Sequence, residues 1–434
     1  MKLKSIQLTD YRNFKDYSID FGKETTILIG KNGMGKTNLI TAIKQSLSFI
    51  FSKNKGELQY DFIASSDQKV ESFSATDARY KYEGDNGDYC YPVSIKAAAV
   101  EMEEKIEWKF QKEYSSSGLK DSLYRDANKR FWRNYSKDNE ITKGLPIFSY
   151  FSDSYPHVTT NIGTKIQEML NSGNALPRNA GYYKWDEEKN CTEIWVQYYT
   201  MQWKNTKWEN GKGDKNYIKL IDQKLINFSN SMSKSINSDD IEIERLEIET
   251  RGKDDVLIVL FKNGNSIPFN QLPQGYKRIF SIVFDIANRS YLLNANCDPT
   301  GIVLIDEIEL HLHPSITQEI LTGLKTTFPK IQFIISTHSP LVITNFKQNN
   351  ENVIYKLYKA DDEYKNEKID DLYGIDYNSG LKDWMDAPYR NSHINELIEA
   401  YQYWKSAEDV TMIERLKNKL KDALGEENER YRKL

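Results

Sequence analysis

A glycine-rich loop between two apolar runs is the feature that most restricts how this chain can fold. Residues 27–43 read ILIGKNGMGKTNLITAI, and they fit the pattern G-x-x-x-x-G-K-[ST] through Gly30, Gly35, Lys36 and Thr37. The run before the loop is β-branched and apolar, as in a buried strand, and the run after it has apolar residues at helical spacing. Strand, loop and helix in this order predict a P-loop, which cradles the phosphates of a nucleotide.

Each part of the predicted P-loop has a role in holding ATP and Mg²⁺. Glycines let successive backbone N–H groups turn toward phosphate oxygens, and the helix N-terminus adds favourable partial charge. Lys36 is expected to reach the β- and γ-phosphates as a catalytic group, and Thr37 to ligate Mg²⁺. The residues expected to bind the nucleotide are Gly30, Lys31, Asn32, Gly33, Met34, Gly35, Lys36, Thr37 and Asn38.

A second motif follows far downstream, in the stretch GIVLIDEIELHLHPS at residues 301–315. An apolar strand that ends in paired carboxylates is typical of a Walker B motif, in which Asp306 would hold Mg²⁺ and Glu307 would activate the attacking water. The alternative is a strand that simply ends in a charged turn. The preceding P-loop favours the Walker B interpretation.

The stretch IQFIISTHSPLVI, at residues 331–343, predicts another buried strand that ends in polar residues. Ligands bind at the carboxyl ends of parallel strands, so His338 is a candidate for a hydrogen bond to the γ-phosphate. The alternative is a structural histidine. For His311 and His313 we favour the structural role, because their spacing and the lack of a nearby third ligand do not make a zinc site.

Residues 269–290 read FNQLPQGYKRIFSIVFDIANRS and predict a second helix N-terminus suited to an anion. Gln274 and Gly275 precede the apolar part of this helix. Since the P-loop already serves the nucleotide of its own chain, the anion expected here is the ATP of a second subunit.

The composition of the chain limits the kinds of partner that it can bind. The net charge of this 434-residue chain is −4, so any DNA contact needs a local patch. The basic stretch 109–143, with Phe131, Trp132 and Tyr135 interleaved, is one candidate, although a solvated helical face is the favoured interpretation. Three scattered cysteines and the lack of a signal peptide or an apolar run of membrane-spanning length predict a cytoplasmic protein without a membrane span.

The segments GKNGMGKT, LPQGYKR, LIDEIELHLHP and STHSP occur in an order that resembles the ABC-type ATPases of the RecF, SMC and OLD group. The resemblance implies an α/β fold: an ABC-type P-loop NTPase head with a mixed β-sheet flanked by helices. It also implies two heads that bury two ATP molecules, with Gln274, Gly275, Lys277 and Arg278 acting on the partner's ATP. Pro273 departs from the usual serine of this signature.

The same resemblance suggests two further residues near the nucleotide. YRNF, residues 11–14, matches the first hairpin of the family, where an arginine such as Arg12 approaches the nucleotide. For the Q-loop, which helps to hold the metal, SATDARY offers Asp77 and SSDQK offers Gln68. We favour Asp77 as a metal ligand.

A looser resemblance, through YPVSIKAAAV, EWKF, GYYKWDEE and the segment after residue 371, is to the Septu ATPases of bacterial anti-phage systems. It implies a separate effector nuclease of the HNH type. Too few residues follow His338 for the Toprim nuclease of OLD proteins, so we expect this chain to hydrolyse ATP and to cut nothing. The alternatives are a RecF- or SMC-like DNA repair ATPase, a PARIS-like ATPase that cages an effector, and a scaffold with structural ATP.

The motifs divide the chain into four predicted segments. Residues 1–111 and 236–370 would build the ATPase head, and residues 112–235 would form a helical and irregular insertion without heptads. Residues 371–434 would form a tail that ends in two amphipathic helices, the second capped by Ser406 or Asp409 and ended by Gly425. The sequence thus predicts an ATPase that forms a dimer or higher oligomer and regulates an effector.

Overall fold

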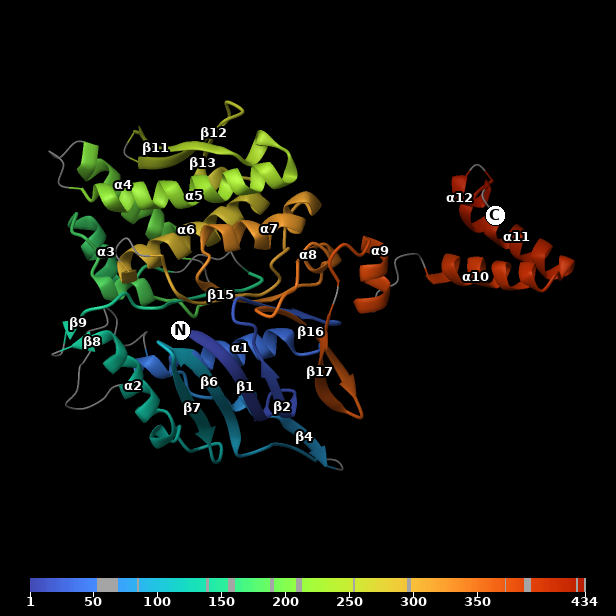
Figure 1. Cartoon of the computed structure of the whole chain (residues 1–434), viewed down its shortest axis with the longest axis horizontal. Coiled ribbons are helices and arrows are strands. Elements are labelled where there is room, and N and C mark those ends of the chain that lie inside the picture. The colour runs from blue at the N-terminus through green and yellow to red at the C-terminus, as the bar shows by residue number, and fades with distance from the viewer. Residues whose placement is uncertain are drawn as a thin grey trace. The chain divides into compact units, whose positions relative to one another are not determined.

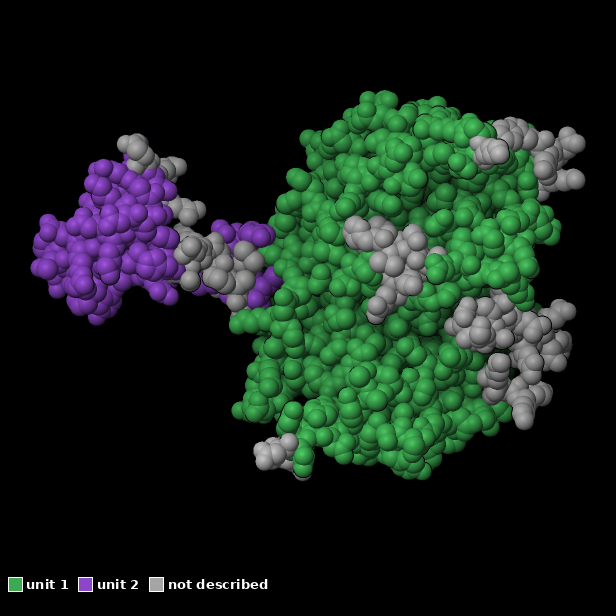
Figure 2. Space-filling model, turned by 180° about the vertical axis from the view of Figure 1, so that it is seen from behind, with its two compact units in different colours: residues 1–375 green, residues 376–434 purple. Residues whose placement is uncertain are grey.

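The computed structural model describes most of the chain. The described residues are 1–52, 69–83, 86–137, 140–154, 161–187, 191–207, 213–252, 254–294, 298–370, 372–385, 392–426 and 428–432. The chain divides into two units, Met1–Ile375 and Asp376–Leu434, which Figure 2 shows in different colours.

A six-stranded mixed sheet forms the centre of the larger unit. Its strands, in spatial order, are β10 (Ile147–Phe151), β14 (Gly301–Ile305), β15 (Ile331–Ser336), β3 (Thr25–Ile29), β16 (Asn352–Ala360) and β17 (Glu363–Ile369). The first five run parallel to their neighbours, and β17 pairs antiparallel with β16. The strands β10, β14, β15 and β3 are buried throughout, as continuous apolar runs are when both faces of a parallel sheet are covered. The predicted α/β fold with a mixed sheet is confirmed.

Helices cover both faces of this sheet (Figure 1). On one face, α1 (Lys36–Leu47) packs between β15 and a four-stranded antiparallel sheet of β2 (Phe14–Asp20), β1 (Lys2–Tyr11), β6 (Val93–Glu101) and β7 (Glu104–Lys112). On the other face lie α6 (Gln274–Asn294) and α7 (Pro314–Thr327), with α5 (Lys215–Ile236) packed on both. Beyond α5 is a three-stranded sheet of β11 (Ile243–Arg251), β12 (Asp254–Phe261) and β13 (Ser266–Pro268).

Shorter elements connect these layers. They are η1 (Ser48–Phe51), η2 (Ala75–Asp77), β4 (Tyr80–Glu83), β5 (Asn86–Tyr89), η3 (Asp121–Leu123), α2 (Arg125–Tyr135), β8 (Ser136–Lys137), β9 (Glu140–Ile141), α3 (Thr164–Asn171), η4 (Arg178–Tyr182), α4 (Thr192–Lys207), η5 (Asp239–Ile241), η6 (Phe269–Gln271) and α8 (Pro340–Thr344). Within the described ranges, no helix is long and apolar enough to cross a membrane.

One buried amide joins the two large sheets. The side chain of Gln332, on β15, accepts a hydrogen bond from the Leu3 amide at 2.7 Å and donates to the carbonyls of Leu3 at 2.9 Å and Gly22 at 2.7 Å. The register of β1 against β6 shifts between Leu3 and Ser5, next to this contact. Gln332 therefore fixes the antiparallel sheet to the strand that leads to His338.

The middle segment is less separate from the head than the sequence indicates. Its helices α2 to α5 agree with the predicted helical content, but β10 is a strand of the central sheet and pairs with β14 along its full length. The prediction that residues 112–235 are an insertion outside the head needs this correction. Strand pairing between segments 154 residues apart leaves no local pattern in the sequence.

The smaller unit, Asp376–Leu434, contains a helix pair. Its elements are α9 (Tyr377–Ser379), η7 (Gly380–Trp384), α10 (Ser392–Ser406), α11 (Val410–Leu424) and α12 (Glu429–Arg432). Leu397, Ile398 and Tyr401 of α10 pack against Leu416 and Leu420 of α11. Of the two predicted caps, Asp409 is the one observed: its carboxylate accepts from the Met412 amide at 3.0 Å. The apolar face of the first predicted amphipathic helix is therefore buried against the second helix.

Candidate nucleotide-binding site

The predicted P-loop connects β3 to the N-terminus of α1. Gly35 adopts φ +90°, and a β-carbon there would lie 2.6 Å from the Asn13 side-chain nitrogen and 2.7 Å from the Phe14 ring. Only glycine fits this contact, because other residues rarely adopt that φ and would collide with the β1–β2 hairpin. Lys31, Asn32 and Gly33 are exposed and Met34 is half-buried, so the tip of the loop faces solvent.

Lys36, the first residue of α1, is almost fully buried, with 5% of its surface exposed. Its ammonium donates to the carbonyls of Gly30 at 2.7 Å and Lys31 at 3.2 Å. Burial lowers the pKa of Lys36 to about 8, although the carboxylates of Asp306 and Glu307 act in the opposite direction. A buried cation inside a glycine loop at a helix N-terminus fits an anionic group such as a phosphate.

Asp306 and Glu307 follow β14 directly and are anchored by the neighbouring strands. The amide of Asp306 donates to the Phe151 carbonyl of β10 at 2.8 Å. On the other side, the hydroxyl of Ser336 donates to the Asp306 carboxylate and accepts from the Glu307 amide at 2.9 Å. The paired carboxylates therefore lie at the carboxyl edge of the sheet, where ligands bind in parallel α/β structures.

His338 and Glu307 face each other at this edge. His338 Nε2 lies 3.8 Å from Glu307 Oε1, and about a third of each side chain is exposed. Burial and the Asp306 carboxylate raise the pKa of Glu307, whereas burial and the Lys36 ammonium lower the pKa of His338. A neutral imidazole can donate or accept a hydrogen bond, and a carboxylate of raised pKa is a better base.

Arg12 lies in the β1–β2 turn and connects it to α1. Its Nε donates to Asp77 Oδ1 at 2.9 Å, and its Nη1 donates to Asn38 Oδ1 at 3.0 Å. The Asn38 side-chain nitrogen donates in turn to Asn13 Oδ1 at 2.8 Å. Asn38 is thereby held by the hairpin, which brings the predicted arginine beside the first turn of the P-loop helix.

The carboxylate of Asp77 is occupied by protein groups. Besides Arg12, it accepts from Gln45 Nε2 at 3.1 Å and from the amide and hydroxyl of Ser74, both at 2.8 Å. The residue is 2% exposed, and these hydrogen bonds hold its pKa below the ordinary value although burial acts the other way. This geometry favours a role in positioning Arg12 over the predicted role as metal ligand. Gln68, the alternative, lies outside the described residues.

The predicted signature loop forms the start of α6. Gln274 and Gly275 are its first two residues, Gln274 exposed and Gly275 half-buried. The prediction that Arg278 acts on a second subunit is wrong, because its side chain is fully buried within its own chain. Its guanidinium donates to the carbonyls of Asp306 and Glu307, each at 3.0 Å. Sequence spacing alone does not say which face of the helix points inward.

Glu309 is a site residue that the sequence analysis missed. Its carboxylate accepts from the hydroxyl of Thr337 at 2.7 Å and from the backbone amide of His338. The available signal in the sequence was a third acidic residue, two positions after Glu307. His313, by contrast, caps α7, since its Nδ1 accepts from the Ser315 amide at 3.4 Å, in agreement with a structural role.

The candidate stacking surface of residues 109–143 is not formed. Phe131, Trp132 and Tyr135 are buried, and Phe131 packs edge-on against Phe49 with ring centroids 5.9 Å apart. Aromatic rings that stack on nucleic-acid bases need an exposed face. The structure therefore agrees with the favoured interpretation, a solvated helical face, because the basic residues and the aromatic residues lie on different faces of α2.

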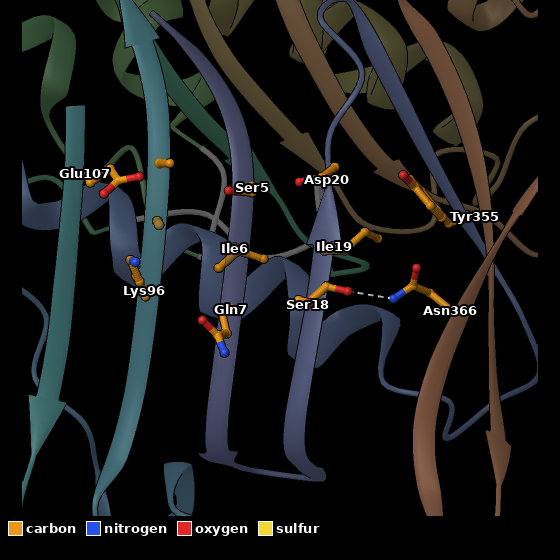
Figure 3. Close-up of a pocket in the computed structure, with 12 residues that line it drawn as sticks. Ser5, Ile6, Gln7, Ser18, Ile19, Asp20, Lys96, Glu107, Tyr355 and Asn366 are labelled. Carbon is orange, nitrogen blue, oxygen red and sulfur yellow. Dashed lines mark hydrogen bonds between the residues drawn. The ribbon is translucent and has the colours of Figure 1, made fainter. Parts of the chain in front are cut away.

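A hollow of about 330 Å³ lies elsewhere, on the antiparallel sheet (Figure 3). Its lining includes Gln7, Lys96 and Glu107, together with Tyr355 and Asn366 of the strands beyond β2. None of the predicted site residues lines it. The candidate nucleotide site therefore lies at the P-loop and at the carboxyl edge of the central sheet, and not in this hollow.

The chain was compared with known proteins. The AAA ATPase domain family model matches residues 1–343. Retron Vc95 probable ATPase of Vibrio cholerae serotype O1 biovar El Tor is 27% identical over 404 residues, which cover 82% of this chain and 74% of that protein. Septu protein PtuA of Bacillus mycoides is 40% identical over 116 residues, which cover 25% of this chain and 16% of that protein.

A solved structure, the SMC head domain from Thermotoga maritima, matches with a TM-score of 0.45 and 13% identity, over 86% of this chain and 100% of that one. The resemblance predicted from the motifs is confirmed by the family match and by the retron and Septu relatives. Because the family match covers most of the chain, the chain belongs to the AAA ATPase domain family and is an ATPase.

Proposed function

We propose that the chain binds ATP with Mg²⁺ at the carboxyl edge of its central sheet. The observation that carries this proposal is the assembly of Lys36, Asp306, Glu307 and His338 after three adjacent strands, β3, β14 and β15. Gly30 to Asn38 would hold the phosphates, and Thr37 and Asp306 would hold the metal. Bound Mg²⁺ would neutralise charge on the phosphate oxygens.

The protein groups divide the work of hydrolysis between them. Glu307 orients a water molecule and takes its proton, for which its raised pKa suits it. Lys36 places a positive charge beside the phosphates, and the neutral His338 ring donates a hydrogen bond to the terminal phosphate. In this scheme Glu307 is the base, and Lys36 and His338 stabilise the developing charge.

Glu307→Gln tests the assignment. It should retain ATP affinity and lose turnover by about 100-fold or more, because the amide cannot take a proton. Glu319→Gln, on α7, is the matched control. Turnover that survives in Glu307→Gln would contradict the assignment and would support a scaffold with structural ATP.

We propose further that two heads pair around ATP. The exposed Gln274 at the N-terminus of α6 supports this idea, because a helix N-terminus attracts anions and the P-loop of the same chain has its own helix for that purpose. Native mass spectrometry of Glu307→Gln, with and without Mg·ATP, should show dimers or higher oligomers only with nucleotide. A monomer under both conditions would contradict pairing.

The biological role that we propose is the regulation of an effector nuclease in a cytoplasmic anti-phage system. The similarity to a retron ATPase and to a Septu protein supports it, and the Asp376–Leu434 unit is the segment proposed to receive the effector. Bound ATP would restrain the effector, and loss of nucleotide would release it.

Co-expression with neighbouring genes tests this role. Purified Glu307→Gln should carry a second protein with nuclease motifs, of the HNH type by resemblance, and nuclease activity should depend on ATP. A bare dimer that binds DNA only with ATP would instead support a RecF-like repair ATPase. Release of an intact effector by a phage protein, without loss of ATP, would support a caging ATPase.

A further inference from the structure

One side chain joins the start of α6 to the backbone that carries the proposed base. The guanidinium of Arg278 is fully buried and donates to three main-chain carbonyls: Asp306 and Glu307 at 3.0 Å each, and Ser152 at 3.3 Å. These carbonyls belong to the residues that directly follow β14 and β10. The planar, always-charged guanidinium is suited to holding several acceptors in a fixed arrangement.

The backbone that Arg278 holds is in an unusual conformation. Glu307 adopts φ +49°, in the left-handed region that non-glycine residues seldom occupy. Such a conformation persists only when its surroundings fix it. The Glu307 amide donates to the Ser336 hydroxyl, and the Glu307 carbonyl accepts from Arg278 and, at 3.0 Å, from the Leu310 amide. Of these contacts, Arg278 is the one that comes from α6, so the direction of the Glu307 side chain depends in part on this helix.

The first turn of α6 also lies directly against the segment that follows Glu307. A β-carbon on Gly275 would be 2.7 Å from the carbonyl oxygen of His311, so no side chain separates the helix from this segment. With Arg278 one turn further along, α6 touches the Walker B region at two points. A displacement of the helix N-terminus must therefore move the backbone around Glu307 or break these contacts.

We infer that Arg278 is a positioning residue, which sets the orientation of the Glu307 carboxylate and transmits to it the position of the α6 N-terminus. The inference rests on the proposed role of Glu307 as the base. It gives α6 a function within its own subunit: whatever binds at Gln274 and Gly275 changes hydrolysis in the same chain through Arg278. Because Arg278 is fully buried and donates to main-chain carbonyls, it acts through the backbone of Glu307.

Arg278→Lys and Arg278→Met test this inference. Lysine keeps the charge but cannot hold three carbonyls in one plane, and methionine removes the donors altogether. We expect kcat, normalised to the sites that bind a non-hydrolysable ATP analogue, to fall about 10-fold for lysine and more for methionine, since small displacements of a reacting group are costly. The dissociation constant of the analogue should change less than about threefold.

Arg289→Lys is the matched control. Arg289 is on the same helix, is equally buried, pairs with Asp285 at 2.7 Å and donates to the carbonyls of Gly181 and Tyr183. The Arg289→Lys variant should lower the melting temperature at least as much as Arg278→Lys does, and its normalised kcat should stay within about twofold of the unmodified protein.

The possible outcomes distinguish a failure of the positioning role from a failure of the proposed base. Unchanged kcat in both Arg278 variants would overturn the inference, and so would a loss of kcat that Arg289→Lys matches. Failure of Arg278→Lys to fold, while Arg289→Lys folds, would assign Arg278 to stability and would also overturn it. If Glu307→Gln itself retains turnover, the proposed base is at fault. If that variant is inactive and Arg278→Lys is fully active, only the positioning role fails.

Discussion

The carboxylate of Glu309 holds the backbone of His338. It accepts from the His338 amide and, at 2.7 Å, from the hydroxyl of Thr337, so one side chain fixes the direction of the loop that follows β15. The carboxylate also lies close enough to act against the lowering of the His338 pKa. The loop after Walker B and the loop that carries His338 are thus one hydrogen-bonded structure.

Glu309→Gln should slow hydrolysis more than it weakens nucleotide binding. The amide can accept only through one oxygen, so one of the two hydrogen bonds is lost, at a cost of about 1.5–3 kcal/mol for a charged acceptor. We expect kcat to fall about 10-fold with a small change in ATP affinity. Steady-state kinetics and a binding titration would measure both. Equal activity in Glu309→Gln and the Glu319→Gln control would show that His338 does not depend on this contact.

The pH profile of kcat for ATP hydrolysis should have an acid limb that is set by the protonation of Glu307. Burial and the carboxylates of Asp306, Glu309 and Asp153 raise its pKa above 4.5, so protonation removes the base at a higher pH than for an ordinary glutamate. Since only the ionised form accepts a proton, kcat should fall as the pH falls through this raised pKa.

Asp153→Asn provides the test, because it removes one of the negative charges that raise the Glu307 pKa. Its acid limb should move to lower pH, and a profile measured between pH 4.5 and 8 on the folded protein would show the shift. An acid limb that moves upward, or equally in Glu319→Gln, would contradict this origin.

Asp77→Asn should distinguish a positioning role from a metal-binding role. The amide cannot accept from Arg12, Gln45 and Ser74 together, so Arg12 loses its fixed place beside Asn38. We expect ATP affinity to fall about 3–10-fold, while the Mg²⁺ concentration for half-maximal activity stays within about twofold.

Asp10→Asn is the control for this test, because Asp10 pairs with Arg79 at 2.7 Å next to the same turn. A requirement for about 10-fold more Mg²⁺ in Asp77→Asn, with unchanged ATP affinity, would restore the metal-ligand prediction.

Removal of residues 376–434 should leave the ATPase folded and active. This unit has its own core, in which Leu420 is fully buried between the two helices. We expect kcat to stay within about twofold, whereas an effector that binds this unit should be lost. Leu420→Asp, which should unfold only the helix pair, is the matched variant in the full chain. Aggregation of the truncated protein would show that the head needs this unit.

Asp222 should make the stability of the protein depend on pH. Burial raises its pKa to about 6, although Tyr199 donates to its carboxylate at 2.7 Å. A carboxyl with a raised folded pKa destabilises the fold progressively as the pH rises from the unfolded pKa toward 6, and fully above that. Asp222→Asn, which keeps an acceptor for Tyr199, should therefore gain more stability at pH 8 than at pH 5. Allowing for partial exposure, we expect a difference of about 1 kcal/mol.

Urea unfolding of Asp222→Asn and of the unmodified protein at pH 5 and pH 8 would measure this difference in the free energy of unfolding. Asp298→Asn, at an exposed position that pairs with lysines, serves as the control. A gain that is equal at both pH values would mean that Asp222 is ionised throughout this range.

The sequence by itself determined the local chemistry of this protein. The spacing of Gly30, Gly35 and Lys36 dictates a phosphate loop, because glycines must precede a helix that begins with the lysine. Continuous apolar runs before Asp306 and before Ser336 predict strands that end at the same edge, and the structure brings Glu307 within 3.8 Å of His338. The apolar residues between Leu397 and Tyr401 recur at helical spacing, which likewise predicts that this face of the helix is buried.

Only the tertiary structure decided which way the remaining groups face. The inward direction of Arg278, the reach of Glu309 to His338 and the use of Asp77 by Arg12 each join segments between 29 and 65 residues apart. The pairing of β10 with β14 spans a longer separation still. Periodicity in a sequence reports neighbours within one helix or strand, whereas these contacts arise from how the packed layers set one element against another.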